Sequence, residues 1–530
     1  MGFGWEGQAH PTEHFLARLP SRFSFLWSGE MVFNGRVRGS GMTGSAREWH
    51  HGVMSATNKT AGTTAASHDS DVTPELRRYM TKGWEPRSAS AATTAAVAPY
   101  AAKRRQQLSE LFPGETIVVS AGRPKVRSND SYYPFRAHSA YVWLTGHQGE
   151  SGVLVMAPRG KVGHDATLFV WPPSDRSTDA FYRDRNRGEL WVGPRPSLAE
   201  ISTTFDLPTR SLSELPKRLD ALMTKGGVRR VRGVDPTVDD RIRSGRAKAD
   251  AELNQALSEL RLVKDDWEIG ELEKAVAGTK RGFEDVISEI PRAGSERWLE
   301  GTFLRRARLE GNDVGYGSIV ACGHHACTLH WTDNDGPVKR GELGLLDMGV
   351  ETHSLYTADV TRTLPLSGRF TPVQRRVYNA VLAAQKAGIA AVQPGAAFMN
   401  PNVAAMSVLL DALIEWGVLS GDRGRLLKAE TYRRYTLHNV SHMLGLDVHD
   451  CAEARNEVYK GGPLVAGMVL TVEPGLYFQR DDLTVPAELR GIGVRIEDDV
   501  LVTADGCRVL SADIPKVAKE VEQWMAATQK

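Results

Sequence analysis

The pattern of apolar and polar positions divides the chain into an irregular stretch followed by two patterned ones. Residues 1–75 are rich in Gly, Ser, Thr and Ala, and no period is sustained there. From residue 76 a basic helical segment, AAKRRQQLSELF, leads into four short β-rich runs, which are TIVVSAG, YVWLTGH, GVLVMAP and ATLFVW. We therefore expect a disordered extension over 1–75 and an α/β domain over 76–262.

A second domain is predicted over 263–530. Apolar residues recur at helical spacing in LRLVKDDWEIGELEKAVAGTKRGFEDVISEI, and Pro291 should stop that helix. The runs GELGLLDMGV, MVLTVEPGLYF and GVRIEDDVLVT are typical of strands, whereas FTPVQRRVYNAVLAAQKAGIAAV is typical of a helix. The chain as a whole is therefore predicted to be α/β (α+β) with two folded domains.

Charge and cysteine content narrow the classes of protein. Lys and Arg number 66 against 64 Asp and Glu, a net charge of +2, so nucleic acid and anionic membrane are not expected as main partners. No apolar run approaches the ~20 residues of a membrane helix, and the N-terminus has no export-type apolar segment. The few scattered cysteines, Cys322, Cys327, Cys451 and Cys507, are predicted to be free thiols, which fits a cytoplasmic protein.

Acidic residues fall at the ends of predicted strands in the second domain. Asp347 ends the apolar run LGLLD, and Asp359 lies in the next extended run, LYTADVTRT. Two carboxylates on adjacent strands repel each other, and one pKa rises unless a cation lies between them. Either acid alone is more simply explained as a turn cap, but the pair favours a cation site.

Two later strand-like runs also direct an acid away from their apolar face. In GVRIEDD, Val494 and Ile496 share one face, so Arg495 and Glu497 point together to the other. The run TVEPG presents Glu473 in the same way. This arrangement is expected of an open sheet that buries one face and lines a cleft with the other.

These four acids and His442, from HNVSHMLGLDVHD, form an oxygen-rich set of metal ligands. Such a set suits divalent ions such as Mn²⁺ better than a closed structural zinc site. Two divalent ions would neutralise four carboxylates. A water bridging ions roughly 3.5–4 Å apart becomes a nucleophile near neutral pH, so the set predicts amide hydrolysis without a covalent intermediate.

The motifs resemble those of the pita-bread metallopeptidases, and among them aminopeptidase P, over roughly residues 76–515. The resemblance implies an N-terminal creatinase/aminopeptidase P-type α/β domain followed by a C-terminal pita-bread domain. It implies five ligands for two divalent ions, which are Asp347, Asp359, His442, Glu473 and Glu497. Of these, Asp359 and Glu497 would each bridge both ions. It implies catalytic roles for His330, His449, Glu473 and Arg495. It implies substrate binding, including the proline pocket, by His438, His449, Tyr477 and Arg495.

One spacing departs from the bacterial enzymes that the chain resembles. Asp347 and Asp359 are 359 − 347 = 12 positions apart, which is one more than in those enzymes. The extra residue should lie in the segment VETHSL, ahead of the strand that carries Asp359. We expect the turn to differ and the ligands to remain.

The resemblance implies an Xaa-Pro aminopeptidase, which removes the first residue from peptides with proline second. The main alternative is an Xaa-Pro dipeptidase, which shares the ligands; RSNDSYYPFRAHSAYVWLTGH in the N-terminal domain favours the aminopeptidase. Three other members of the fold are disfavoured. Methionine aminopeptidases lack the large N-terminal domain that is expected here. Enzymes that hydrolyse creatine use no metal, and non-catalytic binding proteins of this fold have lost ligands, whereas this chain has all five. The resemblance also implies a homo-oligomer, either a dimer or a tetramer.

Overall fold

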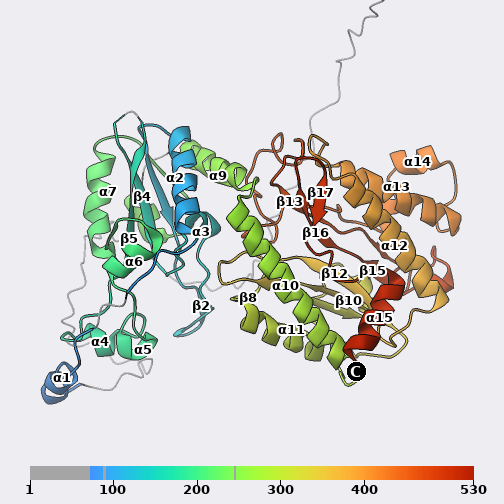
Figure 1. Ribbon diagram of the computed structural model, residues 1–530, viewed down its shortest axis with the longest axis horizontal. Helices are drawn as coiled ribbons and strands as arrows, with labels where there is room; N and C mark the ends of the chain where they lie inside the picture. The colour runs from blue at the N-terminus through green and yellow to red at the C-terminus, as the bar shows by residue number, and fades with distance from the viewer. Residues whose placement is uncertain (1–71, 88–90, 161, 244–245, 530) are drawn as a thin grey trace, which may run out of the picture. The chain divides into compact units, whose positions relative to one another are not determined.

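The computed structural model describes residues 72–87, 91–160, 162–243 and 246–529 (Figure 1). The predicted disorder of 1–71 lies outside the described residues. Helix α1 (Pro74–Met80) begins in the last two residues of the stretch expected to be disordered. Its N-terminus is capped by the Thr73 hydroxyl, which accepts a hydrogen bond from the backbone N–H of Leu76 at 3.2 Å.

The N-terminal domain is built on a five-stranded mixed sheet in the order β6-β5-β4-β1-β7. The strands are β1 (Thr116–Ser120), β4 (Val153–Pro158), β5 (His164–Val170), β6 (Thr209–Ser211) and β7 (Val228–Arg230). Strands β1 and β4 pair antiparallel, as do β4 and β5, whereas β7 and β6 pair parallel with their neighbours. Strands β1, β4 and β5 confirm three of the four β-rich runs expected in this domain.

The two faces of this sheet are covered by different helices (Figure 1). Val118 and Val155 pack with leucines of α7 (Leu215–Met223). The alternate residues Ile117 and Met156 pack with α2 (Ala98–Leu111) and α3 (Ser139–Thr145). The period of two along each strand therefore sends apolar side chains to both faces, as in a sheet buried between helices.

The run YVWLTGH was predicted to be a strand, and that prediction is wrong. Its first five residues belong to α3, in which every side chain is buried, and the next residue, Gly146, closes the C-terminus in the left-handed conformation with φ 72°. A short run that is apolar on all sides has no period to distinguish a buried helix from a buried strand. Here the glycine was the stronger signal.

Smaller elements complete the N-terminal domain: β2 (Val126–Ser128), β3 (Ser131–Tyr132), α4 (Ala180–Arg183), α5 (Glu189–Val192), α6 (Leu198–Phe205), η1 (Leu212–Glu214), α8 (Pro236–Arg241) and α9 (Ala247–Arg261). The helical stretch predicted from Leu260 onward is divided, because α9 ends at Arg261 and α10 (Asp266–Glu289) starts anew. Asp265 and Glu268 form a reciprocal capping box at that start.

The second domain contains small antiparallel sheets. Strand β10 (Leu343–Met348) lies between β9 (Ile319–Cys322) and β12 (Val360–Pro365). The other sheets join β13 (Val469–Val472), β16 (Asp498–Val502) and β17 (Cys507–Val509); β14 (Gly475–Tyr477) and β15 (Gly493–Arg495); and β8 (Asp313–Val314) and β11 (Val350–Glu351).

The remaining helices of this domain are α11 (Glu296–Glu310), α12 (Pro372–Ala390), α13 (Asn400–Glu415), α14 (Arg423–Lys428) and α15 (Ala518–Thr528), with single turns η2 (Gly323–Cys327), η3 (Thr431–Arg434) and η4 (Ala487–Leu489). Leu346 and Met348 of β10 pack into one core with Phe283 of α10, on the helix-covered face of the sheet. Leu345 belongs to a separate cluster with Tyr477, on the opposite face. That opposite face is free to carry polar groups.

Two expectations from composition can be compared with the described residues. No helix in those ranges is long and apolar enough to cross a membrane. All four cysteines are free, as predicted, and three of them are buried.

Candidate metal centre

A cavity of about 490 Å³ opens on the polar face of the second domain. It is lined by nine of the ten residues singled out from the sequence: His330, Asp347, Asp359, His438, His442, His449, Glu473, Arg495 and Glu497. Tyr477, the tenth, bonds to two of these side chains. Residues spread over more than 160 positions of sequence are thus gathered around one cavity.

Asp347 and Asp359 come from neighbouring strands, and both are nearly buried. Asp347 lies opposite Thr361 in the β10–β12 register, and Asp359 directly precedes β12. The Tyr316 hydroxyl donates to Asp347 Oδ1 at 2.6 Å, and Arg495 Nη2 donates to Oδ2 at 2.5 Å. The backbone N–H of Asp359 donates to the buried Asp499 at 3.2 Å. The Asp347 carboxylate is therefore oriented by neighbouring side chains, and the backbone of Asp359 is tied to Asp499.

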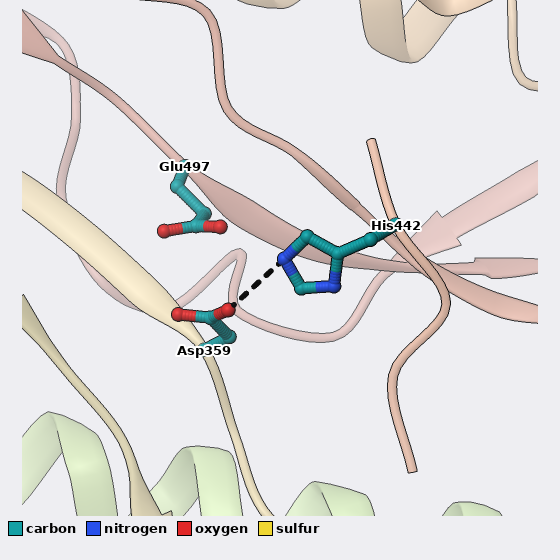
Figure 2. Close-up of side chains that lie close together, drawn as sticks. All are labelled: Asp359, His442 and Glu497. Carbon is teal, nitrogen blue, oxygen red and sulfur yellow. Dashed lines mark ion pairs between the residues drawn. The ribbon is translucent and has the colours of Figure 1, made fainter. Parts of the chain in front are cut away.

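His442 directs one ring nitrogen at the carboxylates (Figure 2). Its Nε2 lies 3.3 Å from Asp359 Oδ2 and 3.5 Å from Glu473 Oε1, while Nδ1 lies 3.2 Å from the carbonyl oxygen of Met443. A carbonyl at Nδ1 fixes the ring with Nε2 turned to the site, as in metal-binding histidines. Ligand atoms of Asp359, His442 and Glu497 all lie within 4.8 Å of one another, a spacing that one ion could bridge.

Glu497 and Arg495 reach the cavity side by side, as their alternation with Val494 and Ile496 predicted. The Thr361 hydroxyl donates to Glu497 Oε2 at 2.7 Å and lies 3.1 Å from Arg495 Nε. Val494 and Ile496 belong to the helix-covered core on the other side. The polar residues of β12 and β15 therefore hold each other in register beneath the carboxylates.

Three carboxyl groups of the site, those of Asp359, Glu473 and Glu497, have raised pKa values in the metal-free protein. Burial raises the pKa of Glu497 well above its usual range, and the charges of Asp359 and Glu473 raise it further. Burial also raises the pKa of Asp359 and raises that of Glu473 to about 7. Burial opposes the charge of His442, but Asp359 and Glu473 outweigh it and raise the His442 pKa to about 9. The site attracts positive charge, which protons supply when metal ions are absent.

A chain of hydrogen bonds connects three of the residues predicted to bind substrate. His438 Nε2 lies 2.7 Å from the Tyr477 hydroxyl, and Arg495 Nη1 donates to the same oxygen at 3.0 Å. Burial and the charge of Arg495 lower the pKa of His438 to about 4, so this imidazole is neutral at physiological pH. These hydrogen bonds hold the neutral imidazole of His438 and the phenol of Tyr477 beside the carboxylates.

His330 and His449 are exposed at the cavity wall. The ring of His449 meets that of His442 edge-on, with centroids 4.4 Å apart. His449 thus lies next to a predicted ligand.

The loop that carries His330 is anchored by the fully buried Glu296, at the start of α11. Its carboxylate accepts hydrogen bonds from the backbone N–H groups of Cys322 and Gly336 and from the indole of Trp331, and lies 2.9 Å from His325 Nδ1. His325 therefore has a structural partner.

Four residues of the centre were missed in the sequence: Tyr316, Thr361, Asp499 and Glu296. Thr361 alternates with the apolar residues of β12, so the period of two could have indicated it. The other three act through tertiary contacts, for which a single sequence carries no signal.

Two family models match the chain. That of metallopeptidase family M24 matches residues 270–504, and that of the aminopeptidase P N-terminal domain matches residues 100–230. The first match contains every residue singled out above.

Several Xaa-Pro aminopeptidases are similar to this chain over most of its length. Xaa-Pro aminopeptidase 2 of Streptomyces coelicolor is 56% identical over 454 residues, which are 85% of this chain and 96% of that protein. The Xaa-Pro aminopeptidase of Escherichia coli is 30% identical over 81% of this chain and 98% of its own length. The structure of E. coli aminopeptidase P with the inhibitor Pro-Leu superposes with a TM-score of 0.74 at 29% identity, covering 82% of this chain and all of that one.

Proposed function

This chain belongs to metallopeptidase family M24, as an aminopeptidase P, and from that premise we propose that it is a metal-dependent Xaa-Pro aminopeptidase. Its substrates would be peptides with proline second, from which it removes the first residue. The observation that supports this most strongly is the cavity in which four carboxylates and His442 meet three further histidines.

We propose that the five acidic and histidine residues hold two divalent ions, most suitably Mn²⁺. The ligands would be Asp347, Asp359, His442, Glu473 and Glu497. The raised pKa values of Asp359, Glu473 and Glu497 support this, because crowded buried carboxylates need cations to stay ionised together. Oxygen donors with one imidazole suit Mn²⁺. When bound, the ions would activate a water as nucleophile and polarise the scissile carbonyl.

The remaining groups of the cavity would act on the peptide. His449 and His330, which are exposed at the cavity wall, would donate hydrogen bonds to the scissile amide and stabilise the negative charge that grows there. Arg495 would hold Asp347 and the Tyr477 hydroxyl in place. The neutral His438 ring and Tyr477 would form a wall against the proline ring.

The competing function is that of an Xaa-Pro dipeptidase. Turnover of an Xaa-Pro dipeptide and of the matching Xaa-Pro-Yaa tripeptide, measured with added Mn²⁺, separates the two. We expect the tripeptide to have clearly the higher kcat/KM. A higher value for the dipeptide would replace the aminopeptidase with the dipeptidase.

We also propose a cytoplasmic location, which the four free cysteines support. A homo-oligomer, either a dimer or a tetramer, remains our prediction from the resemblance. Sedimentation of the purified protein would measure it.

A further inference from the structure

Arg136, in the N-terminal motif RSNDSYYPFRAHSAYVWLTGH, contacts two loops of the catalytic domain. Its Nε donates to Glu351 Oε2 at 2.6 Å, and its Nη2 lies 3.4 Å from the carbonyl oxygen of Leu355. Both groups belong to segment 349–358, which joins the strand of Asp347 to Asp359. The same guanidinium also donates to the carbonyl of Leu446. One side chain therefore ties segment 349–358 to segment 443–450.

Ser139 adds a second contact from the N-terminal domain to segment 443–450. Its hydroxyl donates to Asp447 Oδ1 at 2.6 Å and lies 3.2 Å from Arg136 Nη1, which is itself 3.4 Å from the same carboxylate oxygen. Asp447 precedes His449 by two positions. Within the catalytic domain the two segments are joined by a backbone hydrogen bond of 3.0 Å from the N–H of Thr357 to the carbonyl oxygen of Gly445.

The contacts of Arg136 require a guanidinium. Glu351 is only 3% exposed, so its carboxylate depends on a cationic partner, and Asn312 donates to its other oxygen at 2.7 Å. The planar guanidinium of Arg136 donates hydrogen bonds to this carboxylate and to the carbonyl oxygens of Leu355 and Leu446, which lie on separate segments. A lysine supplies a point charge in place of this planar group and reaches fewer of these acceptors.

His449 is the residue whose place depends on segment 443–450. Its side chain is exposed, so core packing does not hold the ring, and the backbone of the segment carries it to the cavity. A displacement of about 1 Å at a catalytic group can cost about 100-fold in rate. The anchoring of this segment therefore matters to the reaction.

We propose that Arg136, assisted by Ser139, is a positioning residue through which the N-terminal domain holds His449 in its working place. The inference rests on the proposed function. It assigns the motif around Arg136 a task in the reaction of the catalytic domain, in addition to its place in the N-terminal fold.

The kinetic test compares Arg136→Ala with a matched control, Arg123→Ala. Arg123 lies in the same domain, is also partly exposed, and pairs with Asp235 at 2.9 Å within that domain. On an Xaa-Pro-Yaa substrate we expect Arg136→Ala to lower kcat by about 10- to 100-fold, with a smaller change in KM and unchanged metal content. Arg123→Ala should keep wild-type turnover. Wild-type kcat in Arg136→Ala would overturn the proposal.

A double variant tests whether the effect passes through His449. In a His449→Ala background, Arg136→Ala should lower kcat by less than about threefold, because the group that it positions is already absent. Equal losses in both backgrounds would show an unrelated structural effect and overturn the proposal. Ser139→Ala, a milder change at the same contact, should show the same dependence on background and guards against misfolding of Arg136→Ala.

Hydrogen exchange gives a readout that does not need turnover. Arg136→Ala should speed exchange of the backbone amides in segment 443–450, whereas Arg123→Ala should leave that segment unchanged. Unchanged exchange in Arg136→Ala would overturn the positioning role. If the wild-type protein cleaved no Xaa-Pro bond, the proposed function would fail, and exchange would still decide whether Arg136 holds the segment.

Discussion

At the scale of residues, the metal centre is defined by charge crowding. Asp347, Asp359 and Glu497 are each less than 10% exposed, and Glu473 lies beside them. Burial and mutual repulsion raise the pKa values of Asp359, Glu473 and Glu497, so the folded chain binds protons at these three groups that the unfolded chain releases. Metal ions would replace those protons. The metal-free protein depends on the bound protons instead, so its stability is sensitive to pH.

We predict that the free energy of unfolding of the metal-bound protein exceeds that of the metal-free protein by an amount that grows from about pH 7 to about pH 9. The pKa of His442 is raised to about 9, so above the usual histidine pKa of 6.5 the folded state holds more protons than the unfolded state. Its stabilising contribution is complete below pH 6.5 and is lost as pH rises through 9. The lowered pKa values of His438 and His449 act below pH 6.5 and do not enter this range.

Thermal unfolding with and without chelator measures this difference. If the difference in stability stayed constant or became smaller with rising pH, the idea that a proton on His442 takes the place of the metal ions would be contradicted.

A second prediction separates His442 from His449. His442→Ala should lose bound metal, because its Nε2 faces Asp359 and Glu473. His449→Ala should keep two ions and the fold, yet lose turnover by about 10²–10³, because it removes one donor to the developing charge. Metal analysis and rates on the purified variants decide this. Equal metal loss in both variants, or wild-type turnover in His449→Ala, would refute the assignment.

The site residues most readily predicted from the sequence are charged or ionisable side chains at positions where apolar side chains are normally found. Acids and histidines at the ends of apolar strands need a functional reason, and they converge on one cavity. Tyr316 and Asp499 escaped notice because a tyrosine and one more acid are common on any strand or loop. Their roles come from contacts with Asp347 and Asp359 that only the folded chain creates.

At the scale of elements, strands with a clear period of two were predicted well. In β10, Leu346 and Met348 face the helices while Leu345 faces the other way. Helix α3 was mistaken for a strand because its side chains are apolar on all sides, and burial rather than propensity decides its form. The start of α10 was misplaced because the capping residue Asp265 lies inside an otherwise continuous helical pattern.

The packing of α10 against α11 gives a third prediction. A Cβ at Gly282 of α10 would lie 2.4 Å from the ring of the fully buried Phe303 of α11. Gly282→Ala should therefore destabilise the protein by about 1–3 kcal/mol. The control is Gly301→Ala on α11, where a Cβ meets nothing within 4 Å and helix propensity should add about 0.5–1 kcal/mol of stability.

Denaturant midpoints of the two glycine variants and the parent protein measure both effects. An unchanged midpoint in Gly282→Ala would show that the two helices pack less closely than described.

At the scale of the whole molecule, the N-terminal domain contributes to the catalytic centre as well as to the fold. Its motif was noted in the sequence as typical of aminopeptidase P, and in the structure two of its residues, Arg136 and Ser139, hold the segment that carries His449. The sequence could identify that motif but could not show which residues of the second domain it contacts, since 308 positions separate Ser139 from Asp447.

The central claim is that metal ions held in this cavity drive cleavage before proline. Its most direct test is release of the first residue from a matched pair of peptides, Xaa-Pro-Yaa and Xaa-Ala-Yaa, by chelated protein and by protein restored with Mn²⁺. We expect release from the proline peptide alone, its loss on chelation and its return with Mn²⁺. Undiminished cleavage in chelated protein, or equal cleavage of the alanine peptide, would contradict the account.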